Sequence, residues 1–152
     1  FDPAIRSIRD YSALGFHDFV KDKIPVLGIC LGMEMFFQQS QEGKESGLDV
    51  MSGEVVLLPD TMKIPHMGWN NLEITNDSKI LEGVDNNSWV YFVHSYRAKP
   101  NDEKIIVANA DYGIKVPAVV ENGLFFGTQF HPEKSGKVGS LMIKNFLRVC
   151  TK

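Results

Sequence analysis

The fold is decided by the stretch Pro25-Val26-Leu27-Gly28-Ile29-Cys30-Leu31-Gly32-Met33. In this stretch a short apolar run is followed by a cysteine that has a glycine two residues before it and another two residues after it. Such a run is typical of a strand buried on both faces of a parallel sheet, here over 24–29. The pattern Gly-x-Cys-x-Gly is that of a nucleophile elbow, with sulfur in place of a serine oxygen. The pattern predicts that Cys30 is a nucleophile. It also predicts that Gly28 and Gly32 leave room at positions where a Cβ would clash with a neighbouring element.

The residues after the elbow, 32–39, are expected to form a helix with Cys30 at its N-terminus. Unpaired backbone N–H groups and the helix dipole at that position favour a thiolate, the reactive form of the side chain. The residue after the nucleophile, Leu31, would contribute a backbone N–H to an oxyanion hole.

A base for this nucleophile lies far downstream, in Phe126-Gly127-Thr128-Gln129-Phe130-His131-Pro132-Glu133. In extended backbone, His131 and Glu133 point to the same face, and Pro132 favours that geometry for the residue before it. Glu133 is then expected to accept a hydrogen bond from one imidazole nitrogen while the other faces Cys30. The order nucleophile, base, orienting acid is the Cys–His–acid logic of a catalytic triad.

Length and composition indicate one globular domain over 1–152. The chain has 43% hydrophobic and 23% charged residues, and its net charge of −3 gives no basic footprint for nucleic acid. No apolar stretch reaches membrane-spanning length, and no signal peptide is evident. Cys30 and Cys150 are expected to be free thiols in a reducing cytoplasm. His66 and His94 fit no zinc spacing, so neither a metal site nor a cofactor is expected.

Periodicity and turn signals predict a three-layer α/β domain whose later part is built from hairpins. Helices are expected over 2–21 and 137–149, and a loop over 41–48. The expected strands cover 24–29, 55–58, 72–75, 88–94, 104–110, 118–121 and 124–130. Asn122-Gly123 is a strong hairpin signal between the last two of these strands.

The elbow and the segment His131-Pro132-Glu133-Lys134-Ser135 together resemble the class I (triad) glutamine amidotransferases. Three further segments resemble the glutaminase subunits of imidazole glycerol phosphate synthases, an enzyme family of histidine biosynthesis. These are Pro65-His66-Met67-Gly68-Trp69-Asn70, Tyr91-Phe92-Val93-His94-Ser95-Tyr96 and Gly127-Thr128-Gln129-Phe130.

The resemblance implies a flavodoxin-like fold, with a central, mostly parallel sheet and an antiparallel extension. It also implies that the amidotransferase domain over 1–152 is N-terminally incomplete. In the resembled family, three core strands and a Pro-Gly-x-Gly turn precede a residue like Phe1, and that turn donates a second oxyanion N–H.

The resemblance further implies residue roles. Substrate-binding positions would be Leu31, Gly32, Glu34, Ser95 and Tyr96, and many relatives carry glutamine where this chain has Glu34. The face that docks a partner would carry Met67, Trp69, Asn70, Tyr91 and Lys134. The partner would be a cyclase with a (β/α)8 barrel, forming a heterodimer and receiving the ammonia.

The expected reaction is therefore hydrolysis of L-glutamine to glutamate and ammonia, which the cyclase uses to make imidazole glycerol phosphate and aminoimidazole carboxamide ribotide. Two alternatives stay open. One is the amidotransferase subunit of another synthase, for anthranilate, GMP or carbamoyl phosphate. The other is a binding fragment that is catalytically inert because part of its oxyanion hole is missing.

Overall fold

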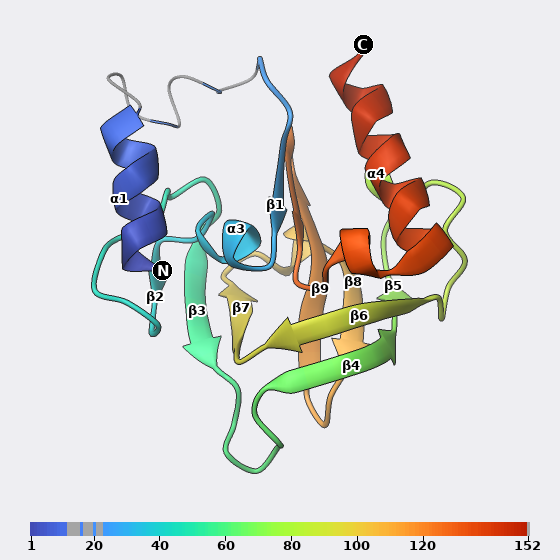
Figure 1. Cartoon of the computed structure of the whole chain (residues 1–152), viewed down its shortest axis with the longest axis horizontal. Helices are drawn as coiled ribbons and strands as arrows, with labels where there is room; N and C mark the ends of the chain where they lie inside the picture. The colour runs from blue at the N-terminus through green and yellow to red at the C-terminus, as the bar shows by residue number, and fades with distance from the viewer. Residues whose placement is uncertain (12–15, 17–19, 21–22, 152) are drawn as a thin grey trace.

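The computed structural model describes residues 1–11, 16, 20 and 23–151, which form helices around a mixed β-sheet (Figure 1). The main sheet has the strand order β1-β10-β9-β8-β5. Its strands are β1 (Val26–Ile29), β5 (Glu73–Ile74), β8 (Ile106–Asp111), β9 (Lys115–Asn122) and β10 (Phe125–Thr128). β1 and β10 are parallel, whereas the other neighbours are antiparallel. The expected α/β fold is present, but its described sheet is mostly antiparallel because tight turns join β8, β9 and β10.

Two smaller sheets flank the main one. β2 (Gln39–Ser40), β3 (Gly53–Leu57) and β7 (Tyr96–Pro100) form one of them, in that order. β4 (His66–Asn71) and β6 (Trp89–His94) form an antiparallel pair, which crosses the main sheet at a steep angle (Figure 1). The β4–β6 pair carries most of the residues expected to bind a partner.

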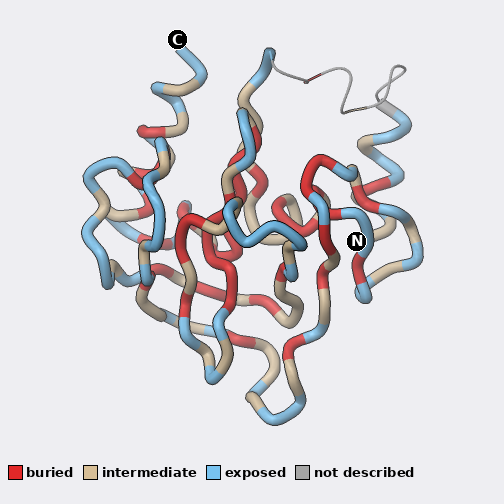
Figure 2. Tube along the Cα trace, turned by 180° about the vertical axis from the view of Figure 1, so that it is seen from behind, coloured by how far each residue is buried: buried red, intermediate tan, exposed pale blue. Residues whose placement is uncertain are grey.

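The main sheet is buried on both faces, as alternating side chains of its central strands show. Phe126 and Val119 belong to one buried cluster with residues of α4 (Gly136–Cys150). Phe125 and Val120 belong to a second cluster, with Phe36 and residues of β3 and β7. Successive strand residues point to opposite faces, so this arrangement gives three layers. Buried residues accordingly concentrate along the central strands (Figure 2).

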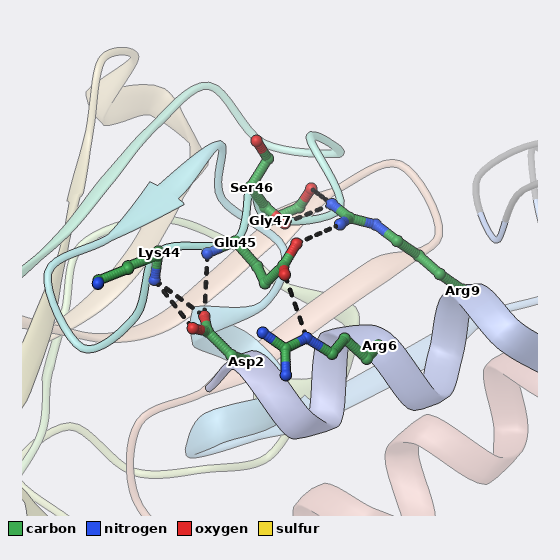
Figure 3. A network of polar contacts seen from close by, with 7 residues as sticks. All are labelled: Asp2, Arg6, Arg9, Lys44, Glu45, Ser46 and Gly47. Carbon is green, nitrogen blue, oxygen red and sulfur yellow. Dashed lines mark hydrogen bonds and ion pairs between the residues drawn. The ribbon is translucent and has the colours of Figure 1, made fainter.

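Helix α1 (Asp2–Tyr11) is held to the loop that follows β2 by a polar network (Figure 3). The Asp2 carboxylate accepts hydrogen bonds from the backbone N–H groups of Lys44 and Glu45, each at 3.0 Å. Arg6 and Arg9 donate to the two oxygens of the Glu45 carboxylate, each at 3.1 Å. The expected helix over 2–21 is confirmed as far as Tyr11; most of its remainder lies outside the described residues.

The prediction of a helix over 32–39, after the elbow, is wrong beyond the first turn, since α3 spans only Leu31–Glu34. The next carbonyl groups, which a longer helix would use internally, are taken by the loop before β3. Leu48 N–H donates to Met35 O at 2.8 Å, and the Phe36 carbonyl accepts from both Val50 and Met51 at 3.0 Å. Gln39, expected to be the last residue of that helix, instead forms β2 with Ser40.

The other expected elements mostly agree with the structure. The predicted strands over 55–58, 72–75, 88–94, 104–110, 118–121 and 124–130 overlap β3, β5, β6, β8, β9 and β10. The Asn122-Gly123 turn is confirmed, with Asn122 paired to Phe125 and Gly123 at a φ of +60°. Short 3-10 turns occur at Lys79–Leu81, Glu103–Ile105 and Pro132–Lys134 (η1, η2 and η3). No helix among the described residues is both long and apolar enough to cross a membrane.

Candidate active site

Cys30 occupies the elbow between β1 and α3 in a strained backbone conformation. Its φ of 52° and ψ of −106° lie where residues other than glycine are uncommon, and such strain clusters at functional sites. Its N–H donates to Thr128 O at 2.7 Å, which anchors the elbow to β10. The geometry is the sharp strand-to-helix turn that the Gly-x-Cys-x-Gly pattern predicts.

The two glycines of the elbow differ in what they do. A Cβ on Gly28 would lie 2.7 Å from the backbone of Gly32 and from the ring of Phe36, so close packing excludes a side chain there. A Cβ on Gly32 would meet no atom within 4 Å. The expected steric role is thus confirmed for Gly28 and wrong for Gly32, whose position faces open space.

The Cys30 thiol lies among polar groups. Its Sγ atom is 3.8 Å from the carbonyl oxygen of Val93 in β6 and 3.9 Å from Nε2 of Gln129. Gln129 is fully buried, and the same Nε2 donates to Oε1 of buried Glu34 at 3.1 Å. Sequence analysis missed Gln129, although an amide in the apolar run two residues before His131 is an unusual strand residue.

The surroundings of the sulfur oppose a thiolate. Burial, and after it the nearby Glu34 carboxylate, raise the pKa of Cys30 to about 11. Burial also raises the pKa of Glu34, to about 7. The expected thiolate at a helix N-terminus is therefore not favoured in this state. The reason is that α3 has a single turn, so its dipole is weak against the cost of desolvating a charge.

His131 and Glu133 make the contact expected of a base and its orienting acid. Nδ1 of His131 lies 2.6 Å from Oε1 of Glu133. The contact does not arise from extended backbone as expected, because β10 ends at Thr128 and Glu133 lies in η3. A 3-10 turn beginning at Pro132 folds the carboxylate back onto the imidazole instead.

The elbow and the histidine are brought to one edge of the sheet. Ile29 pairs with Thr128 at the ends of the parallel strands β1 and β10, and Cys30 and His131 follow those two positions. Both then contact β6: Cys30 Sγ lies against Val93 O, and His131 N–H donates to Tyr91 O at 2.9 Å. Among the hydrogen bonds of the described chain, none joins the Cys30 sulfur to the imidazole.

Ser135 adds a second link between this histidine and β6. Its hydroxyl donates to His131 O at 2.6 Å and accepts from Tyr91 N–H at 3.0 Å. The backbone of His131 is therefore fixed to Tyr91 both directly and through one buried side chain.

The expected substrate-binding residues surround the elbow to different degrees. Leu31, Gly32 and Glu34 belong to α3, directly beside the sulfur. Ser95 and Tyr96 form the turn from β6 into β7, immediately after Val93 and His94. The Ser95 carbonyl accepts from Leu58 N–H at 2.9 Å, which ties this turn to the end of β3.

Large apolar side chains cover the outer face of the β4–β6 pair. Met67, Trp69 and Trp89 are 62%, 53% and 58% exposed, and the ring of Tyr91 lies 6.0 Å from that of Trp69. We call Met67, Trp69, Trp89 and Tyr91 the docking face. Trp89 was missed in sequence analysis; its alternation with Tyr91 along β6 was the available signal. Lys134 lies in η3, directly after Glu133.

The two remaining strand histidines contact one another. Nδ1 of His66 lies 2.8 Å from Nε2 of His94. Asn70, expected at the partner interface, directs its amide nitrogen inward, at 3.3 Å from Nε2 of His66. In the part of the chain that the structure describes, no three His, Cys, Asp or Glu side chains gather in a way that could hold a metal ion.

Comparison of the sequence with known proteins shows the family of this chain. The glutamine amidotransferase class-I family profile matches residues 7–150. Imidazole glycerol phosphate synthase subunit HisH of Methanocaldococcus jannaschii is 46% identical over 88% of this chain and 68% of that protein. The Archaeoglobus fulgidus subunit HisH is 49% identical over 84% of this chain and 65% of that protein. The Geobacillus kaustophilus subunit HisH is 42% identical over 98% of this chain and 77% of that protein.

Solved structures support the fold alone. A candidate GMP synthase subunit from Thermoplasma acidophilum superposes with a TM-score of 0.61 at 20% identity, covering 84% of this chain and 57% of that one. A glutamine amidotransferase from Thermotoga maritima superposes with a TM-score of 0.61 at 19% identity, covering 97% of this chain and 54% of that one. The chain thus spans a little over half the length of these two structures.

Proposed function

This chain belongs to the class-I glutamine amidotransferase family, and we propose that it is the glutaminase part of an imidazole glycerol phosphate synthase. The reaction would release ammonia from L-glutamine for a second subunit, which carries out the cyclase reaction in a (β/α)8 barrel. One observation carries the proposal: an elbow cysteine and a His–Glu pair lie at one sheet edge in a chain with 42–49% identity to such subunits.

In the proposed reaction, the sulfur of Cys30 attacks the carboxamide carbon of glutamine. The backbone N–H of Leu31, which already favours negative charge on the sulfur, would bind the oxyanion that forms beside it. His131, held by Glu133, takes the thiol proton and delivers it to the departing nitrogen, so that ammonia leaves. A γ-glutamyl thioester remains, and water activated by His131 hydrolyses it to glutamate.

The raised pKa of Cys30 fits a glutaminase that is slow when alone. At neutral pH the thiol is protonated, so attack requires transfer of its proton to a base. The imidazole of His131 would have to reach the sulfur, which contacts Val93 and Gln129 in the present state. We infer that docking of the cyclase brings this approach about and so activates the reaction.

The docking face is the surface proposed for the cyclase. Exposed aromatic and methionine side chains with few charges among them are typical of the centre of protein interfaces. The proposed contact also includes Lys134 in η3 and Asn70 in β4, although the Asn70 amide turns toward His66. The expected heterodimer would thus form around Trp69 and Tyr91.

The test is ammonia-dependent and glutamine-dependent synthesis with the cyclase. Cys30→Ala should abolish synthesis from glutamine, by at least about 1,000-fold, and leave synthesis from ammonium salts unchanged. Cys150→Ala is the matched control and should leave both reactions intact, because that cysteine is exposed near the end of α4. Glutamine-dependent synthesis that survives in Cys30→Ala would overturn the assignment of the nucleophile.

The same complex separates the alternatives. Glutaminase turnover should rise sharply when the cyclase and its ribotide substrate are added to the unsubstituted chain. A response to an anthranilate, GMP or carbamoyl phosphate synthase instead would assign the chain to that enzyme. If a glutamine-analogue diazo-ketone fails to label Cys30 in the activated complex, the chain is an inert binding protein.

A further inference from the structure

A buried pair of histidines lies between the proposed active site and the docking face. His66 in β4 and His94 in β6 are opposite each other in the strand register and are 3% and 5% exposed. Nδ1 of His66 and Nε2 of His94 are 2.8 Å apart, so one of these nitrogens must donate to the other. The contacts at the two outer nitrogens decide which one does.

The contact of His94 with the backbone of Tyr96 determines which nitrogen of His94 carries a proton. Its Nδ1 atom lies 2.6 Å from the carbonyl oxygen of Tyr96, and a carbonyl can only accept a hydrogen bond. Nδ1 therefore carries a proton. If the imidazole is neutral, Nε2 has none and accepts from Nδ1 of His66.

The contact at the other end leads independently to the same tautomers. The Asn70 side chain is oriented by two backbone groups: its Oδ1 accepts from Asn71 N–H at 2.8 Å, and its Nδ2 donates to Asp111 O at 2.9 Å. The second hydrogen of Nδ2 points to Nε2 of His66 at 3.3 Å, so that nitrogen accepts. His66 is therefore protonated on Nδ1, as the contact with His94 requires.

The chain of hydrogen bonds thus runs in one direction, from Asn70 through His66 and His94 to the Tyr96 carbonyl. It needs two neutral imidazoles, and the surroundings favour that form. Burial lowers the pKa of His66 to about 4, with His94 as a further cause. Burial also lowers the pKa of His94 to about 4; its bond to Tyr96 O opposes this, and His131 adds to it.

Among the residues that the structure describes, the groups that face the pair carry no negative charge that could compensate an added proton. The rings of Phe92 and Tyr112 are stacked on His66, with centroids at 4.5 and 4.0 Å. Besides His66, the described titratable neighbour of His94 is His131, just before η3, which disfavours positive charge on His94. A proton added to either imidazole would put two donors against each other and break the chain.

We propose that His94 and His66 are positioning residues, which hold the Tyr96 carbonyl and with it the Ser95–Tyr96 turn beside the elbow. This turn closely follows Val93, the residue whose carbonyl contacts the Cys30 sulfur. The proposal rests on the proposed glutaminase function, in which the turn binds the amino-acid end of glutamine. The histidine pair then sets substrate affinity without touching the reacting atoms.

The first test reads the tautomers in the unsubstituted chain, without substrate. Two-bond 15N–1H NMR spectra should show both imidazoles as neutral Nδ1–H tautomers, unchanged from pH 8 to about pH 5. Free imidazole added to the sample, which titrates near pH 6.5, is the reference. An Nε2–H tautomer at either residue, or protonation of either one near pH 6.5, would overturn the proposal.

The second test compares two amide replacements in the complex with the cyclase. His94→Asn keeps a donor near the position of Nδ1, whereas His94→Gln moves the amide to the position of Nε2. We expect His94→Gln to raise the KM for glutamine about tenfold with kcat within twofold of the parent, and His94→Asn to restore KM to within about threefold. Ammonia-dependent synthesis should be unchanged in both.

The outcomes separate this inference from the function on which it depends. An active parent complex with equal KM values in both variants would refute positioning by His94 and leave the glutaminase assignment intact. A parent complex without glutaminase activity would refute the proposed function, and positioning for that reaction with it. If His94→Gln does not fold, the tautomers of the unsubstituted chain decide alone.

Discussion

The sulfur of Cys30 lies 3.8 Å from the carbonyl oxygen of Val93, and Val93 is paired across the strands with Met67 of the docking face. One strand, β6, therefore has the proposed nucleophile at one edge and its neighbouring strand β4 at the other. The backbone of Tyr91 in the same strand accepts from His131 N–H. A small shift of β6 on docking would move the surroundings of both proposed catalytic side chains together.

The first prediction concerns the reactivity of Cys30 in the isolated chain. Because burial raises its pKa to about 11, the thiolate fraction at neutral pH is small and grows with each pH unit. We expect the rate of alkylation by iodoacetamide to rise about tenfold per unit between pH 7 and pH 10. Peptide mapping by mass spectrometry distinguishes Cys30 from exposed Cys150. A rate that levels off below pH 8 would contradict the prediction.

The variant Glu34→Gln tests what raises the pKa of Cys30. The Glu34 carboxylate is the second contribution to the raised pKa of Cys30, after burial. Glu34→Gln removes that charge and keeps an oxygen that can accept from Gln129, so the alkylation profile should move to lower pH. An unchanged profile would assign the raised pKa to burial alone.

The second prediction concerns the stability of Glu34→Gln. Burial raises the pKa of Glu34 from 4.5 to about 7, so the fold favours the protonated carboxyl. The stability from this group is complete below pH 4.5 and is lost as pH rises through 7, because the unfolded chain releases the proton first. At pH 8 the substitution should raise the free energy of unfolding by about 3 kcal/mol, and at pH 4 it should change it little.

Urea unfolding at pH 4, 6 and 8 measures this difference. Glu103→Gln, at an exposed position in η2, is the control and should keep the pH dependence of the parent. If Glu34→Gln and the parent differ by the same amount at every pH, the buried carboxyl does not titrate as described.

Local patterns in the sequence were sufficient for the elbow and the hairpin. The Gly-x-Cys-x-Gly pattern specifies its own strand–turn–helix geometry, and Asn122-Gly123 requires only its own turn geometry. The contact between His131 and Glu133 was also foreseen, although a 3-10 turn and not extended backbone produces it. Spacing of two residues is compatible with both geometries, so the pattern alone did not separate them.

What could not be predicted depends on partners distant in the chain. The helix after Cys30 ends at Glu34 because residues 47–51 bind its next carbonyl groups. β4 was missed because polar residues and Gly68, at a φ of +119°, interrupt its apolar pattern. The raised pKa of Cys30 was not predicted either. Its first cause is burial, in a fold that brings Val93 and Gln129 to the sulfur, and the Glu34 carboxylate is the second.

The third prediction concerns the two elbow glycines. Gly28→Ala would place a methyl group 2.7 Å from the backbone of Gly32, which cannot move without opening the elbow. We expect it to lower the free energy of unfolding by about 1–3 kcal/mol, as overpacking does. Gly32→Ala is the matched control: its methyl group meets nothing within 4 Å, so stability should change by less than about 0.5 kcal/mol. Equal losses in the two variants would argue against the observed packing.

The last prediction concerns the docking face. Trp69 is 53% exposed and packs edge-on against Tyr91, an arrangement typical of the few residues that dominate an interface. Trp69→Ala should weaken binding of the cyclase by about 2 kcal/mol or more, close to a thirtyfold rise in Kd by calorimetry. Leu147→Ala is the control, because Leu147 is 55% exposed but lies near the C-terminal end of α4, away from β4 and β6 (Figure 1). Equal affinities for Trp69→Ala and the parent would remove Trp69 from the interface, and a loss for Leu147→Ala alone would move the interface to α4.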